Sequence, residues 1–194
     1  MPRLFQRLAE GVAIEELEKD HPHGYGEFRY GDDSPTGEPI VYINSSRFPD
    51  QKNWQNFIKL ELLHGMKYKE PELHQDIYNT ALADPEYMKF ARTSYDILTG
   101  KIPNPETGKY VPEDKREKRR NFEDWHKYSR FDQLMGGYAA AGDPGLYHGH
   151  WDRDKLPMGP ELRQKLEWLR SEYEYQPSLG QKPDSNVGQR PVPK

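Results

Sequence analysis

Glu61 and His64 are the residues whose types and spacing fit a catalytic site best in this sequence. Residues three apart on a helix are neighbours on its surface, so the carboxylate and the imidazole can act together. A histidine nitrogen can hold a divalent metal ion, and a nearby carboxylate can take a proton from a metal-bound water. Leu60, however, lies four residues before His64, where a second histidine would complete a metal pair, and its isobutyl group has no lone pair. The stretch therefore indicates a fold more firmly than an activity.

The spacing of apolar residues predicts the elements that position this pair. A first helix is expected over residues 3–19, closed by His21-Pro22, and two short strands over 24–30 and 40–44. The next helix begins near Asp50, a suitable N-cap, and runs to about residue 69; it is apolar nearly all round, which is typical of a buried helix. Further helices are predicted over residues 71–82, 84–98, 121–141 and 160–175.

These elements predict an α+β fold, mainly helical, with a small β-hairpin or sheet packed on a buried helix. The hydrophobic fraction of 34% across 194 residues predicts a thin core in which aromatic side chains supply much of the burial. We expect one domain with appendages: a core at 1–99 that contains the buried helix at 50–69, a long polar and basic loop at 100–120, C-terminal helices at 121–175, and a Pro-rich tail at 176–194. Gly136 and Gly137 in the helix over 121–141 predict a close approach by a neighbouring element.

The order of helix, two strands, buried helix with Glu61 and His64, and further helix resembles the zincin metallopeptidase fold over residues 1–141. In glutamate-type zincins a downstream helix gives the third zinc ligand, and the segment 130–139 looks like that element, with Asp132 at the ligand position. The resemblance implies a metal site at His64 and Asp132, with Glu61 as the catalytic residue. A strand ending in Tyr-Ile-Asn before the motif helix, and loops rich in Pro and Tyr, are also similar to zincin-like domains of tailed phages.

Two arrangements could replace the missing first ligand. Metzincins place a third ligand six residues after the second histidine, with a glycine midway; those positions are Glu70 and Lys67 here, and the lysine departs from that pattern. His74, on the next predicted helix, is a weaker metal candidate. Because Leu60 removes one of the three usual ligands, we expect no cofactor, and zinc only if the peptidase alternative holds.

Three other groups of histidine and acidic residues are weaker candidates for metal binding. A second Glu-x-x-His at Glu123 and His126 is similar to the paired motifs of ferritin-like di-iron sites, but Glu86 lies at a helix start, and Glu123 is better interpreted as a first-turn acid after the cap Asn121. If the segment 148–154 is extended, four alternating side chains lie on one side and could bind a divalent ion: His148, His150, Asp152 and Asp154. The favoured interpretation is instead a loop anchored by Trp151. His21-Pro22-His23 is interpreted as a polar turn.

The loop at 101–120 ends in a basic run that could contact nucleic acid, namely Lys115, Arg116, Lys118, Arg119 and Arg120. Acidic residues near this run reduce its positive electrostatic potential, and the chain carries a formal charge of −4. Nucleic acid is therefore a possible but not a favoured partner.

The remaining composition narrows the function classes. The sequence has no cysteine, which excludes disulfides and thiol catalysis, and it has no apolar run long enough for a membrane span or a signal peptide. We expect a structural or interaction protein of a larger assembly, most simply a phage virion component, located in the virion or the host cytoplasm. The tail at 176–194 is expected to contact other protein subunits, because it holds few aliphatic side chains to bury in its own chain.

Overall fold

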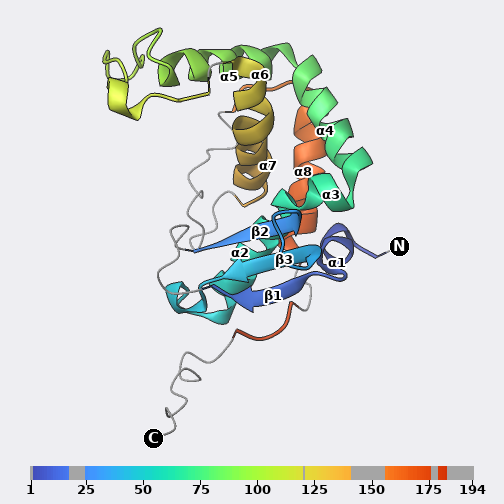
Figure 1. Cartoon of the computed structure of the whole chain (residues 1–194). Helices are drawn as coiled ribbons and strands as arrows, with labels where there is room; N and C mark the ends of the chain where they lie inside the picture. The colour runs from blue at the N-terminus through green and yellow to red at the C-terminus, as the bar shows by residue number, and fades with distance from the viewer. Residues whose placement is uncertain (1, 18–24, 120, 141–155, 176–178, 183–194) are drawn as a thin grey trace, which may run out of the picture.

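The computed structural model of the chain describes residues 2–17, 25–119, 121–140, 156–175 and 179–182 (Figure 1). Its architecture is α+β and mainly helical, as predicted. The N-terminal part contains α1 (Leu4–Ala9) and a three-stranded sheet of β1 (Ala13–Glu16), β2 (Gly26–Gly31) and β3 (Gly37–Ile43). The helices that follow are α2 (Gln51–His64), α3 (Met66–Lys69), α4 (Pro71–Ala83), α5 (Pro85–Leu98), α6 (Phe122–Trp125), a π-helix η3 (His126–Arg130), α7 (Phe131–Ala139) and α8 (Pro160–Glu174), with 3-10 turns η1 (Ser45–Arg47) and η2 (Glu113–Lys115).

The sheet corrects the prediction of one helix over residues 3–19. The helix ends at Ala9, Gly11 adopts a left-handed φ of 68°, and the next residues form β1, which pairs in parallel with β3. Only a glycine takes this turn readily, and the turn directs the chain onto the free edge of β3. The two predicted strands are confirmed as the antiparallel pair β2 and β3.

The predicted buried helix is present, but it ends earlier than expected. Asp50 caps α2 by accepting a hydrogen bond from the backbone N–H of Asn53 at 2.8 Å. The helix ends at His64, and Gly65 follows it against the ring of Phe28 on β2. A Cβ added at Gly65 would be 2.5 Å from that ring, so only a glycine fits there. The residues after this contact form the separate short helix α3.

Local capping chemistry places the later helices close to their predicted bounds. Asp84 accepts hydrogen bonds from the N–H groups of Glu86 and Tyr87 at the start of α5, and Asn121 accepts one from Asp124 at the start of α6. The predicted helix over 121–141 is confirmed as α6 and α7 joined through the π-helix η3. The apolar face of α8 is fully buried at Leu162, Leu166 and Leu169.

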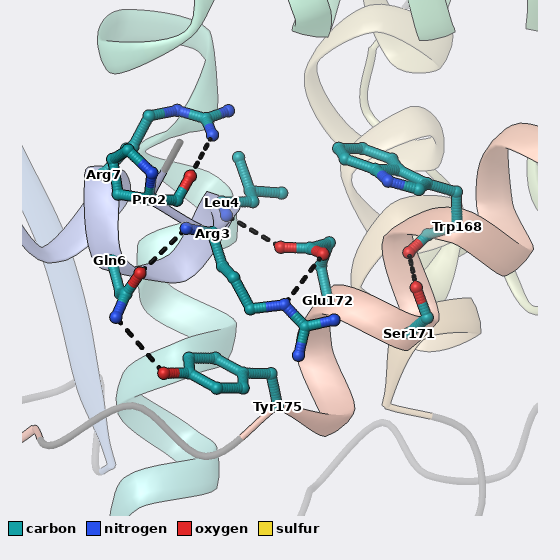
Figure 2. Close-up of polar contacts among 9 residues, drawn as sticks. All are labelled: Pro2, Arg3, Leu4, Gln6, Arg7, Trp168, Ser171, Glu172 and Tyr175. Atoms are coloured by element: carbon teal, nitrogen blue, oxygen red, sulfur yellow. Dashed lines mark hydrogen bonds and ion pairs between the residues drawn. The ribbon is translucent and has the colours of Figure 1, made fainter.

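Helix α8, near the C-terminus, contacts both the N-terminal helix α1 and the buried helix α2. Its buried Glu172 accepts a hydrogen bond from the N–H of Leu4 at 2.8 Å and pairs with Arg3 at 3.4 Å (Figure 2). The buried ammonium of Lys59 on α2 donates to the carbonyl oxygen of Tyr173 at 2.6 Å. Helices α1, α2 and α8 therefore share one core.

The described part of the tail makes contacts within its own chain. Leu179 is buried with 6% exposure, and the carbonyl of Gly180 accepts a hydrogen bond from Gln51 at 2.9 Å. The backbone N–H of Lys182 also donates to Gln51. Residues 179–182 thus pack on the start of α2 in their own chain, because the Gln51 side chain pairs their backbone groups. Residues 176–178 and 183–194 lie outside the described part.

The loop after α5 forms an arm, which we define as residues 99–119. In Figure 1 it extends away from the rest of the molecule, on the side opposite α4 and α8. Its bend is held by hydrogen bonds from the N–H of Asn104 to the carbonyl of Lys109 at 2.8 Å and from the N–H of Gly108 to the carbonyl of Asn104 at 2.7 Å. The bend is therefore held by the arm's own backbone, and the Tyr95 hydroxyl of α5 donates to the carbonyl of Arg119 at the far end of the arm at 2.9 Å. Across the described residues, no helix combines the length and apolar character that crossing a membrane requires.

Candidate functional site

The candidate site lies where α2 crosses α7. Leu60 is buried at 2% exposure, and a Cβ added at Gly136 would lie 2.8 Å from Leu60 Cδ1. The predicted close approach at Gly136 is therefore present, and its partner is Leu60. His64 is one turn beyond Leu60 on α2, and Asp132 is one turn before Gly136 on α7. The position directly before Glu61 is thus occupied by an apolar helix–helix contact.

Glu61 and His64 form a hydrogen-bonded pair within α2. Nδ1 of His64 is 3.2 Å from Oε2 of Glu61, and the side chains are 37% and 8% exposed. Burial acts to lower the pKa of His64, but the hydrogen bond to Glu61 and the negative charges of Glu61 and Asp132 outweigh it, so this pKa is raised. The Glu61 carboxylate, which would act on a water in a metallopeptidase, is here hydrogen-bonded to the histidine.

His74 and Asp132 lie near this pair. The His74 ring packs edge-on against Phe131 at 5.3 Å, next to Asp132 in sequence. Burial lowers the pKa of His74 although the charge of Asp132 opposes it, and Nε2 of His74 is buried without a hydrogen-bond partner among the described residues. Even so, the described part of the chain brings no three His, Cys, Asp or Glu side chains together in a group that could hold a metal.

Glu70 and Lys67, the two positions of the metzincin-type alternative, make other interactions in the structure. The Glu70 carboxylate accepts a hydrogen bond from Arg7 Nε at 2.6 Å, and the Lys67 ammonium lies 5.0 Å from the centre of the Tyr68 ring. Glu70 thus joins α3 to α1 as an ion pair and is not directed to His64.

The second Glu-x-x-His separates its two residues. His126 is fully buried, with Nε2 3.1 Å from the Tyr87 hydroxyl, whereas Glu123 is exposed in the first turn of α6. Glu86 is also exposed, at the start of α5. These three residues do not converge, in agreement with the first-turn interpretation of Glu123. Burial, together with the positive charges of Arg130 and Arg92, lowers the pKa of His126 to about 4.

The basic run forms no continuous positive surface in its described residues. Arg116 donates from Nε to the carbonyl of Val111 at 3.1 Å, and its guanidinium covers Gly100. Arg119 pairs with Glu117 at 3.4 Å. Lys115 and Lys118 are exposed. Arg120, and the candidates His21, His23, His148, His150, Asp152 and Asp154, lie outside the described residues.

Sequence reasoning missed a pocket between α4 and α8. Its volume is about 320 Å³, and it lies beside Trp168, which is 40% exposed. In the sequence, the pocket is indicated only by Trp168 on the predicted helix over 160–175. Isolated apolar residues are common on protein surfaces, so this tryptophan alone does not predict a pocket. The lining residues are Leu73, Asp76, Ile77, Gln164, Lys165 and Trp168.

Comparisons of this chain with protein-family models, with curated proteins and with solved structures return no match.

Proposed function

We propose that this chain is a zincin-like protein without peptidase activity that serves as a structural or interaction component of a larger assembly, such as a phage virion. The observation that supports this most strongly is the contact between Leu60 and Gly136 at the α2–α7 crossing. In the zincin arrangement this level of the motif helix carries the first zinc ligand, and here it carries packed hydrocarbon. The exposed arm is consistent with an assembly role, because ordered segments outside the core are common sites of partner binding.

The alternative is a metal-dependent peptidase that uses Glu61 and His64. It is favoured by one observation, the buried Nε2 atom of His74, which has no partner among the described residues near Asp132. A zinc ion in that region would supply a Lewis acid, but it would have to displace the hydrogen bond between Glu61 and His64.

Elemental analysis of the purified full chain after dialysis tests the proposal against this alternative. We expect zinc far below one ion per chain and no hydrolysis of a casein substrate. About one zinc per chain, together with hydrolysis that is lost in Glu61→Gln while the metal is retained, would establish the peptidase instead.

A further inference from the structure

We propose that the arm of one chain docks in the α4–α8 pocket of a second copy, so that the chain assembles head to tail. This deepens the proposed assembly role and rests on it, because it names the partner as the chain itself. In Figure 1 the arm extends away from helices α4 and α8, whose residues line the pocket, so we place the arm and the pocket of a contact in different copies.

The arm presents an aromatic anchor on a pre-formed turn. Tyr110 is 56% exposed and directly follows Lys109, whose carbonyl closes the turn by accepting the N–H of Asn104. Ile102 adds a further exposed apolar side chain at 38%. Because hydrogen bonds and prolines already order this backbone, little conformational entropy remains to be lost when it binds. Aromatic side chains presented in this way are the residue type that most often dominates interface energies.

The pocket has a complementary apolar interior. Leu73 and Ile77 from α4 and Trp168 from α8 contribute its apolar lining, and the volume of about 320 Å³ suits one aromatic side chain with its neighbouring backbone. Tyrosine also fits a half-open pocket of this kind, since its ring can be buried while its hydroxyl stays in water.

The charges at the two surfaces are complementary. Lys165 and Asp76 line the pocket, and Lys165 Nζ is 2.7 Å from Asp76 and 3.9 Å from Glu161 on the adjoining turn of α8. Two carboxylates beside the pocket therefore share one ammonium group. These carboxylates are 59% and 77% exposed, which leaves a net negative rim. Lys109 is exposed beside Tyr110 and would face this rim when the ring enters the pocket.

Such a contact uses two different surfaces, and it therefore leaves a free arm at one end and a free pocket at the other. Contacts of this type build rings or open filaments rather than closed two-fold dimers. The geometry points to a self-assembling chain whose growth depends on both Tyr110 and Trp168.

The test is analytical ultracentrifugation of the full chain over a range of concentrations, with Tyr110→Ala, Trp168→Ala and an equimolar mixture of the two variants. We expect the wild-type chain to form larger species as concentration rises, and each variant alone to associate at least about tenfold more weakly. The mixture should recover association but stop at dimers, because it contains only one intact arm and one intact pocket per pair. Tyr128→Ala is the matched control, since Tyr128 is also 56% exposed but lies outside the arm, and it should associate like the wild type.

Two results would overturn this inference. One is a wild-type chain that remains monomeric at every concentration up to its solubility limit. The other is an associating wild type whose two variants do not recover dimers when they are mixed, which would place the contact elsewhere. Neither result would alter the zinc content of the chain, so failure of this inference is distinguishable from failure of the proposed function.

Discussion

The spacing Glu-x-x-His occurs at Glu61 and His64 and again at Glu123 and His126, and the two pairs have opposite environments. On α2 the pair is hydrogen-bonded at 3.2 Å, and His64 has a raised pKa. Where α6 meets η3, Glu123 is exposed, His126 is fully buried, and the pKa of His126 is lowered to about 4. The same spacing thus gives one hydrogen-bonded pair with a raised histidine pKa and one buried histidine whose pKa is lowered.

The difference arises from what each helix packs against. Helix α2 is buried nearly all round, so the Glu61 carboxylate is largely shielded from water. It is hydrogen-bonded to His64 instead. The short helix α6 begins at the cap Asn121, which leaves Glu123 in the solvated first turn, and His126 turns inward to stack on Phe122 at 5.5 Å. A short motif therefore indicates chemistry only when the packing of its helix is known.

The largest expected effect comes from breaking the core beneath the first pair. Leu60→Ala should lower the free energy of unfolding by ~2–5 kcal/mol, because Leu60 is buried and packs against Gly136. Urea unfolding measures this loss. Leu82→Ala is the matched control, since Leu82 is 42% exposed and should cost no more than about 0.5 kcal/mol. Equal losses in both variants would show that α2 is not buried.

The second pair makes stability fall in acid. The folded-state pKa of His126 is about 4 and its ordinary value is 6.5, so between these values the unfolded chain binds the proton more strongly. This residue should therefore remove about 2 kcal/mol of stability between pH 8 and pH 5. Comparing the unfolding of the wild-type chain and His126→Gln at both pH values isolates the contribution, because the variant cannot titrate. An unchanged pH slope in the variant would mean that His126 is accessible to water.

The first pair, Glu61 and His64, should make the folded chain more stable in acid, and its effect should be smaller than that of His126. Because the folded-state pKa of His64 is raised, the stability it provides is fully present below its unfolded pKa and is lost as pH rises through the folded value. His64→Gln should thus lower stability more at pH 5 than at pH 8, by roughly 0.2–1 kcal/mol, the range for solvent-exposed ion pairs. The same urea measurements detect it. A loss that is larger at pH 8 would reverse the assignment of the two histidines.

Sequence reasoning succeeded where local chemistry decides the structure. The caps Asp50, Asp84 and Asn121 fix helix starts through hydrogen bonds to nearby backbone groups, and the apolar character of α2 is readable from its residues alone. It failed where distant segments decide. The residues of β1 have helical spacing but pair with β3, and Leu179 finds its burial against segments far away in the chain.

The candidate site shows the same division. Gly136 predicted a close approach, but nothing local identified Leu60 as its partner or placed His74 beside Phe131. The engagement of Glu61 by His64 also depends on the burial that α2 receives from the rest of the fold. Residue types along the chain thus identified the candidates, and tertiary packing determined which atoms are free to react.

The proposed function depends most on the apolar contact between Leu60 and Gly136 at the α2–α7 crossing. The most direct measurement is the zinc content of the full-length variant Leu60→His after dialysis, beside the wild type and the double variant Leu60→His with Asp132→Asn. The account predicts about one zinc per chain in Leu60→His, and far less in the wild type and in the double variant, since a histidine at this level would add a ligand beside His64 and Asp132. A Leu60→His protein that folds, as judged by circular dichroism, but holds no more zinc than the wild type would contradict it.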